Sequence, residues 1–332
     1  MEITKKARKV DLWDFIRSNN HLVTLVTLMI IATIVTKGIF IKPSNLSSII
    51  LRASILGTIA IGQTLVILTA GIDLCVAANV GFTVAMMSLS LRMGIGPLLT
   101  MAIGITAPTV VGFLNGQLVA RTMVPPFIVT LATSMIIWST NLAAVGAHAT
   151  VFYEIQEYIN NIMSFIPIVG AQAFPAIVWI FFSIFWILIL RYSTFGHNVY
   201  ATGGKEKAAF FSGVKVKRVK ILVYTFSGLF AGIGSLLYCY KLGGTNPVAG
   251  KEFLLESIAA TVIGGTSLYG GEGKMFGTFI GSLVMIILVN FMNIANVNPF
   301  IQQSIIGGIF IGFVYALDRV RTLRLMKLYQ KE

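Results

Sequence analysis

Charged residues are scarce in this chain of 332 residues, because Asp, Glu, Lys and Arg together make up only 11% of it. An ordinary soluble domain contains about 25%. Hydrophobic residues make up 56% of the chain, and its mean hydropathy is +0.86. So few polar groups do not cover the surface of a soluble domain. The composition therefore excludes a soluble enzyme, a disordered chain and a secreted disulfide scaffold, and it predicts a protein whose main solvent is lipid.

Residues that ligate metals or carry out redox and proton chemistry are also rare. The two cysteines, Cys75 and Cys239, lie in apolar contexts and form no CxxC pair, and the three histidines form no HExxH motif. We therefore expect no disulfide and no metal site. No series of acidic or histidine residues runs along the apolar segments, as a proton relay requires.

The sequence also lacks a Walker A phosphate loop. The nearest segment is 271–274, Gly-Glu-Gly-Lys, but Leu268 occupies the position of the first glycine and Met275 follows the lysine. The loop needs glycine where its backbone surrounds phosphate, and a Ser or Thr hydroxyl that binds Mg²⁺. We therefore predict that the chain hydrolyses no ATP itself and carries no cofactor.

Ten apolar runs dominate the sequence, and each is a candidate for a membrane-spanning helix of about 20 residues. Their approximate bounds are 22–40, 54–70, 74–91, 97–119, 126–146, 164–190, 221–239, 257–269, 275–294 and 300–317. The runs therefore predict an all-α, polytopic membrane protein with about ten transmembrane helices. Because the second, third and eighth runs are short, eight spans with two re-entrant segments are an alternative.

The net charge of +13 is typical of nucleic-acid-binding proteins when it is taken alone. However, if the N-terminus is cytoplasmic and the ten runs alternate, 19 of the 25 Lys and Arg residues fall in cytoplasmic segments. This distribution is the positive-inside bias of a membrane protein. We therefore expect both termini in the cytoplasm and no nucleic-acid partner. The predicted parts are a cytoplasmic segment 1–20, a transmembrane domain 21–318 with a basic cytoplasmic loop 191–220, and a basic cytoplasmic tail 319–332.

A single aspartate, Asp73, lies between two apolar runs. A carboxylate at that depth is unfavourable unless it is hydrogen-bonded or faces a water-filled cavity. Two compatible interpretations follow. Asp73 caps the following helix by accepting hydrogen bonds from free backbone N–H groups, or it lies on a transport pathway.

Other polar residues inside the apolar runs are candidate lining residues of a pathway for a small neutral solute. They are Gln63, Asn79, Asn115, Asn141, Asn290 and Asn293. The alternative for each is a hydrogen bond to a neighbouring helix. Pro125, Phe127 and Thr130 are further candidates, because a proline pair with an aromatic residue either begins a helix or shapes a kink beside the pathway.

Glycines spaced four residues apart recur along the apolar runs, and this spacing allows helix backbones to approach closely in lipid. The pairs are Gly112 and Gly116, Gly228 and Gly232, Gly277 and Gly281, and Gly308 and Gly312. We expect them to mark ordinary packing contacts within the bundle.

The basic loop contains a short amphipathic segment that ends in Phe210 and Phe211. One interpretation is a solvated loop that carries positive charge. Apolar residues exposed to water usually mark a partner's binding site, and a short helix here would suit a cleft of a cytoplasmic protein. The candidate contact residues are Gly204, Ala208, Ala209, Ser212 and Gly213.

Four segments, in order, resemble motifs of the membrane permease subunits of bacterial ABC sugar importers of the ribose, xylose and galactose type. Residues 70–77 read AGIDLCVA beside the family's GGIDLSVG, and residues 125–131 read PPFIVTL beside PxFIxTL. Residues 195–214 match FGxxxxAxGGNxxAAxxSGI closely, and residues 258–273 read IAATVIGGTSLYGGEG beside IAAxxxGGTSLxGGxG. The resemblance covers nearly the whole chain, with the motifs in the same order.

The resemblance implies a division of labour among subunits. Two permease copies, identical or related, form the path, and a periplasmic binding protein delivers solute. A cytoplasmic ATPase, which carries ATP and Mg²⁺, docks below and drives alternating access in the bacterial inner membrane. The residues around Ala208 and Gly213 resemble the Glu-Ala-Ala-x-x-x-Gly coupling signature of ABC importers, with Lys207 in place of the glutamate.

The chain departs from the family pattern at Cys75, Ala77 and Lys205, where the family usually has Ser, Gly and Asn. We expect a monosaccharide as solute, with a sugar-like signal molecule, a polyol or another small polar solute as alternatives.

Two other classes of protein remain open. A stand-alone secondary transporter or facilitator needs no partner, although the missing acidic relay argues against ion coupling. A membrane scaffold would tolerate apolar replacement of its buried polar residues.

Overall fold

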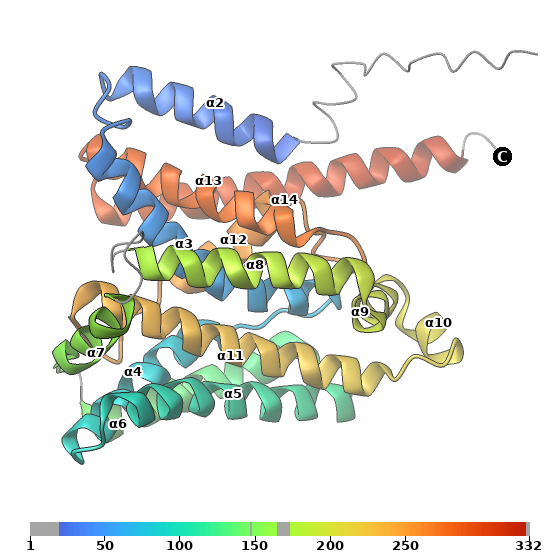
Figure 1. Ribbon diagram of the computed structural model, residues 1–332. Coiled ribbons are helices and arrows are strands. Elements are labelled where there is room, and N and C mark those ends of the chain that lie inside the picture. Colours follow the sequence, from blue (N-terminus) through green and yellow to red (C-terminus); the bar gives the residue numbers. More distant parts are fainter. Residues whose placement is uncertain (1–19, 147, 165–172, 330–332) are drawn as a thin grey trace, which may run out of the picture.

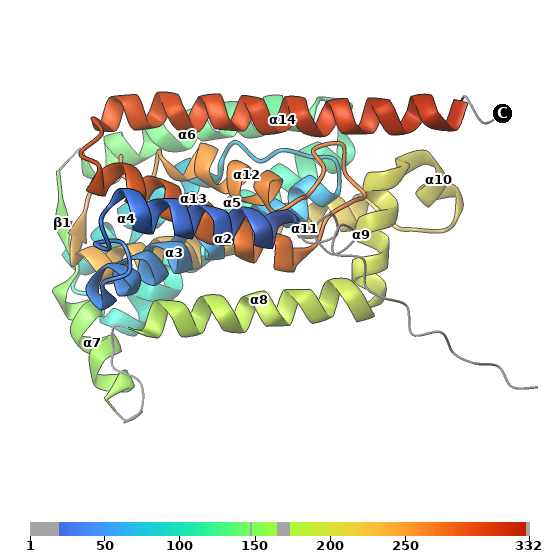
Figure 2. The same cartoon turned by 90° about the horizontal axis from the view of Figure 1, so that it is seen from above.

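The computed structural model describes residues 20–146, 148–164 and 173–329. The chain forms a bundle in which the long helices run roughly along one common axis (Figures 1 and 2). The helices are α2 (Asn20–Val35), α3 (Pro43–Leu68), α4 (Val76–Arg92), α5 (Pro97–Arg121), α6 (Pro126–Val145), α7 (Tyr153–Met163), α8 (Phe174–Tyr192), α9 (Thr194–Gly204), α10 (Glu206–Phe211), α11 (Val216–Leu242), α12 (Phe253–Ile263), α13 (Met275–Ile294) and α14 (Pro299–Tyr329). The predicted all-α fold is therefore confirmed.

Six helices of the described residues are long and apolar enough to cross a membrane, namely α3, α5, α6, α8, α11 and α13. Four of the other predicted runs correspond to shorter apolar stretches in α2, α4, α12 and α14. Length and composition alone thus support six spans, fewer than the ten that the apolar runs predict.

Several helix bounds differ from the predicted runs, although 275–294 coincides with α13. The predicted run 54–70 was too short at its start, because α3 begins at Pro43, a residue well suited to the first helical turn. The run 257–269 was too long, because α12 ends before Gly264 and the next residue, Gly265, has a φ of +88°. Helix α14 runs on to Tyr329, through most of the predicted tail.

The centre of the bundle is formed by α3 and α11. Most of α3 is buried, whereas α5, α6 and α8 leave most of their side chains partly or fully exposed on the outside of the bundle, as lipid-facing helices do. Close packing depends on the predicted glycines. A Cβ at Gly112 on α5 would meet the backbone of Gly228 on α11, and one at Gly277 on α13 would meet the backbone of Gly264. Three of the four glycine pairs therefore mark helix contacts, but Gly308 and Gly312 face open space.

Short elements close one end of the bundle. The strands β1 (Thr150–Val151) and β2 (Gly244–Thr245) pair antiparallel with Thr150 opposite Thr245. Helix α7 follows β1 and buries Ile155, Ile159 and Met163 against α4 and α11. Residues 148–164, which lie between two of the predicted apolar runs, thus contain a short strand and a helix. The helices α9 and α10 lie at the opposite end, to the right in Figure 1; we call it the α10 end.

Helix α4 begins near the middle of the bundle rather than at one end. Residues 69–75 lead from the end of α3 into the interior, where Asp73 bonds to Ser227, a residue near the middle of α11. This irregular segment is fastened by Thr130 of α6, whose Oγ1 accepts a hydrogen bond from Leu74 N at 3.0 Å and donates to Ile72 O at 3.3 Å. The break places backbone and polar side chains in the centre of an otherwise apolar bundle.

Candidate functional site

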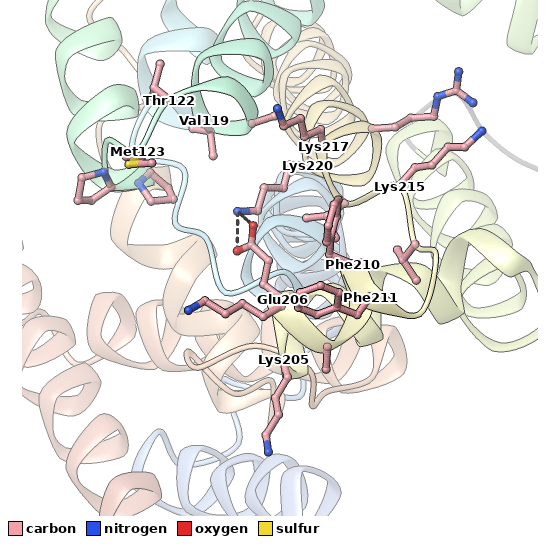
Figure 3. Close-up of a pocket in the computed structure, with 18 of the residues that line it drawn as sticks. Val119, Thr122, Met123, Lys205, Glu206, Phe210, Phe211, Lys215, Lys217 and Lys220 are labelled. Atoms are coloured by element: carbon pink, nitrogen blue, oxygen red, sulfur yellow. Dashed lines mark hydrogen bonds and ion pairs between the residues drawn. The ribbon is translucent and has the colours of Figure 1, made fainter.

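A groove of about 1700 Å³ opens at the α10 end (Figure 3). Its walls come from the end of α5, the turn 122–126 that leads into α6, the helix α10 and the first turns of α11. Basic residues line much of it, namely Lys205, Lys207, Lys215, Lys217, Arg218 and Lys220. The groove thus brings together the proline segment and the basic loop, which the sequence analysis treated as separate features.

The predicted coupling segment contains the six-residue helix α10 and the glycine turn that ends it. Within this helix, Ala209 is buried, whereas Ala208 is exposed along the groove. Gly213 has a φ of +87°, a conformation that favours glycine. Its N–H donates to Phe210 O, and Val214 N donates to Ala209 O, both at 3.0 Å. These bonds satisfy carbonyls at the helix end, as left-handed helix caps do.

Large apolar side chains stand exposed around the groove, and three of them are the most exposed. Phe211 is 84% exposed and Phe210 65%, and their rings contact each other with centroids 5.7 Å apart. Met123, in the turn opposite, is fully exposed. Of the other predicted contact residues, Gly204 and Ser212 are also exposed, and Ser212 lines a neighbouring small cavity. Exposed aromatic residues grouped beside a basic groove are typical of a protein-binding surface.

An ion pair crosses the inner wall of the groove. Lys220 Nζ, on α11, lies 2.8 Å from both carboxylate oxygens of Glu206, on α10. Both residues also line a second, more enclosed cavity of about 310 Å³, together with Val119 and Pro126. The remaining walls of this cavity are Thr69, Ala70, Gly71, Thr202, Gly203 and Tyr224. We call it the inner cavity.

Asp73 is fully buried, and both of its carboxylate oxygens have partners in the chain. Oδ1 accepts a hydrogen bond from Cys75 N at 2.8 Å, and Oδ2 accepts one from Ser227 Oγ at 2.7 Å. The carboxylate therefore fixes the turn just before α4 and joins it to α11, although it accepts no hydrogen bond from the helical residues of α4 themselves. Asp73 lines neither the groove nor the inner cavity.

Three of the predicted pathway amides are fully buried, and two of them lie beside Cys75. Asn79 Oδ1 is 3.7 Å from the Cys75 thiol, and Asn115 of α5 also lies beside that thiol. Gln63 of α3 has no hydrogen-bond partner for its side-chain amide among the described residues, and neither has Asn79 Nδ2. Buried amides without partners are unfavourable by about 1–3 kcal/mol each. These residues are therefore among the buried polar groups of the described chain that remain available to bind water or solute.

The other predicted asparagines pack against or bond to neighbouring helices, which is the alternative to lining a pathway. Asn290 exchanges two hydrogen bonds with Asn45 across α13 and α3, at 2.8 and 3.1 Å. Asn293 accepts a hydrogen bond from Gln302 Nε2 at 2.9 Å, and Asn141 is buried beside Gly81 of α4. Pro125 lines the groove, Phe127 is exposed on α6, and Thr130 holds the segment before α4 as described above.

Helix α9 is fixed to the bundle through Tyr200. Its hydroxyl donates a hydrogen bond to Gly273 O at 2.9 Å, in the loop that precedes α13. Burial raises the pKa of Tyr200 above its usual range, so the hydroxyl keeps its proton and remains a donor at neutral pH. The same loop bonds to α3, because Gly271 N donates to Leu68 O at 2.9 Å.

The polar face of α11 is the main feature that sequence reasoning missed. Lys220, Tyr224 and Ser227 follow one another at helical spacing and face α10, the inner cavity and Asp73 in turn. Ser235 continues the face by donating a hydrogen bond to Val80 O at 2.8 Å. The period of 3.6 residues is visible in the sequence, but only if it is sought among polar residues. Sequence reasoning also missed a cluster of three ionisable residues, in which Glu256 of α12 lies near Glu252 and Arg52.

Comparison with known proteins gives a consistent result. A family model described as "Branched-chain amino acid transport system / permease component" matches residues 45–314. The chain is 36% identical over 303 residues to the ribose import permease protein of Bacillus subtilis (strain 168), which covers 90% of this chain and 91% of that protein. It is 33% identical over 286 residues to the D-allose transport system permease protein of Escherichia coli (strain K12), with 85% of each covered.

A third relative is the fructose import permease protein of Rhizobium meliloti, which is 32% identical over 311 residues, with 90% of this chain and 84% of that protein covered. No solved structure matches the chain significantly. The family match extends over most of the described helices, including the groove, the inner cavity and the broken segment before α4. The chain therefore belongs to the family of multi-pass membrane permease components of ABC importers, and it is a permease subunit rather than an enzyme.

Proposed function

We propose that this chain is the transmembrane permease subunit of an ABC importer and that it translocates a monosaccharide. The observation that carries the proposal is the similarity, over most of the chain, to permeases named for ribose, allose and fructose. A neutral solute also suits a bundle interior whose available polar groups at mid-depth, on Gln63 and Asn79, are amides.

The proposed orientation places the α10 end in the cytoplasm. Most basic residues of the described chain that lie at helix ends gather there, in agreement with the positive-inside rule. They are Arg121, Arg191, Lys205, Lys207, Lys215, Lys217, Arg218, Lys220 and Lys274. Both termini then lie in the cytoplasm, with segment 1–20 and tail 319–332 on that side of the transmembrane domain 21–318. Irregular chain completes the crossings of α4 and α12 inside the bundle, where non-helical backbone is tolerated.

The groove at the α10 end is the proposed docking site of the cytoplasmic ATPase, which supplies ATP and Mg²⁺. Phe210, Phe211 and Met123 provide the apolar contact, and α10 is the segment that inserts into a cleft of the partner. The opposite end, with α7, receives the periplasmic binding protein. A second permease copy completes the path, and the assembly lies in a bacterial inner membrane.

Helix α11 offers a direct connection from the ATPase to the bundle interior. Lys220 is paired with Glu206 on α10, and Ser227, two turns further along α11, is bonded to Asp73 at the start of α4. We propose that a shift of α10 moves α11 and thereby the break before α4, so that the two states of alternating access differ in these contacts. Asn79 and Asn115 lie beside this break, and in this proposal they and the unpaired amide of Gln63 become the solute contacts.

The test is reconstitution of the chain in liposomes with its ATPase and binding protein. We expect at least one of D-ribose, D-allose and D-fructose to stimulate ATP hydrolysis and to be taken up only when ATP is present. A stand-alone secondary transporter or facilitator predicts instead that the purified chain alone takes up sugar, with no nucleotide. A membrane scaffold predicts no uptake in either preparation.

A further inference from the structure

The inner cavity contains two hydroxyl groups that the chain does not satisfy. Tyr224 is 1% exposed and Thr202 is 2% exposed, yet Tyr224 Oη and Thr202 Oγ1 have no hydrogen-bond partner among the described residues. Both residues line the cavity, from α11 and α9 respectively. Because a buried hydroxyl that has lost its bonds to water without replacement is unfavourable, two of them facing one cavity indicate a ligand or ordered water that supplies the missing bonds.

The backbone of the cavity wall leaves space beside the Tyr224 hydroxyl. Gly71 lies beside Tyr224, and a Cβ at position 71 would be only 2.5 Å from Tyr224 Oη. The preceding residue, Ala70, has a φ of +60°, which is rare for a residue with a side chain. Strained backbone of this kind is found mainly at functional sites. The volume of about 310 Å³ lies at the lower end of the range for small-molecule pockets.

The position of the cavity fits a step of solute release. On α11 it lies between Ser227, which is bonded to Asp73 in the bundle interior, and Lys220, which faces the groove. Val119, Pro126, Glu206 and Lys220 form the wall shared by the cavity and the groove. The ion pair between Glu206 and Lys220 therefore separates the inner cavity from the open α10 end.

We propose that the inner cavity is a binding subsite for a neutral polyhydroxylated solute on its way out of the bundle, a proposal that rests on the permease function proposed above. Hydroxyl groups of the solute complete the hydrogen bonds of Tyr224 and Thr202, each of which offers both a donor and an acceptor. The two charges in the wall are already paired with each other at 2.8 Å, so the site attracts a neutral ligand rather than an ion.

The experiment uses the permease–ATPase complex and its binding protein in proteoliposomes that contain ATP and increasing concentrations of one unlabelled sugar. The probe is whichever of D-ribose, D-allose and D-fructose is taken up. The measured quantity is the lumenal sugar concentration that halves the initial uptake rate of the labelled sugar. The variants are Tyr224→Phe and Thr202→Val, which remove only the unpartnered hydroxyls and keep the packing. The matched control is Thr225→Val, whose hydroxyl bonds only to Ile221 O of its own helix.

We expect lumenal sugar to inhibit uptake by the wild type, and we expect each cavity variant to raise the half-inhibiting concentration about three- to tenfold. Thr225→Val should leave it unchanged. The external sugar concentration for half-maximal uptake should also stay unchanged, because the binding protein sets it. Equal half-inhibiting concentrations in the wild type and the cavity variants would mean that the cavity holds water only, which overturns the subsite. A wild type that takes up none of the three sugars with ATP overturns the permease function itself.

Discussion

The two ends of the bundle carry short helices outside the long ones, and two of these, α7 and α10, differ in what covers their apolar side. Helix α7 buries Ile155, Ile159 and Met163 against α4 and α11. Helix α10 buries Ala209 but leaves Phe210 and Phe211 65% and 84% exposed. The apolar side of α7 is covered by other helices of this chain. Helix α10 instead exposes aromatic side chains to water, which is typical of a surface that binds a partner.

The polar contacts of the two ends show the same difference. At the α7 end, Tyr240 Oη donates a hydrogen bond to Asn160 Oδ1 at 2.8 Å, and Phe152 N donates to Gly243 O at 2.9 Å. Helix α10, by contrast, is joined to α11 by an ion pair whose glutamate side chain is 55% exposed. Exposed ion pairs contribute little stability. Helix α10 is therefore held loosely enough to move with a partner.

The largest expected effect is that of Gly213→Arg. The new side chain would occupy a backbone with φ +87° and would reach into the proposed ATPase contact, so ATP-driven uptake should fall to background while the protein still inserts into the membrane. The matched control is Gly94→Arg, which has a φ of +73° and open space around it but lies at the other end. Uptake of labelled sugar in proteoliposomes is the measurement. Normal uptake and normal co-purification of the ATPase with the Gly213 variant would contradict the coupling assignment.

The next effect concerns the exposed aromatic pair. Replacing Phe210 and Phe211 together with Ser should weaken binding of the ATPase by at least about 30-fold, because buried aromatic anchors at interfaces contribute about 2 kcal/mol or more. The melting temperature of the permease alone should not fall. The control is Tyr153→Ser on α7, which removes an aromatic ring that is 70% exposed. If both changes reduced ATPase affinity equally, the two ends would not differ as proposed.

A change on the buried helix should act on stability instead. Ile155→Ala on α7 should lower the free energy of unfolding by about 2–5 kcal/mol, because Ile155 is fully buried. Phe211→Ala on α10 should change it by no more than about 0.5 kcal/mol. Thermal or denaturant unfolding in detergent measures both. Comparable losses for the two variants would show that α10 is packed within the chain as firmly as α7.

The smallest expected effect is that of Glu206→Gln, which breaks the ion pair with Lys220. Because that glutamate is about half exposed, the unfolding free energy should fall by no more than about 1 kcal/mol. The difference should shrink further at high salt, which screens exposed charges. The control is Glu157→Gln, at an exposed position of α7, which should leave the unfolding free energy unchanged. A loss of several kcal/mol would mean that the α10 end is held more firmly than its exposure indicates.

Much of the architecture is predictable from local patterns. The long apolar runs predicted an all-α membrane protein. Most of these runs correspond to helices, and α13 has the predicted bounds. The spacing of glycines predicted close helix contacts at four pairs, and three of them form such contacts. Helix ends were less predictable: α14 continues to Tyr329 because its last residues are good helix formers, and α7 lies in a segment that has no long apolar run.

The sequence by itself determined that this protein lies in lipid, which of its segments are basic, and where a small amphipathic helix interrupts them, because composition and periodicity act over short stretches of chain. Only the tertiary structure decided that Asp73 pairs with Ser227, that Asn290 is bound to Asn45, and that two hydroxyls remain open in one cavity. These outcomes depend on how each helix is rotated about its axis and which helix packs beside it. Such contacts join residues far apart in the sequence, and no local pattern encodes them.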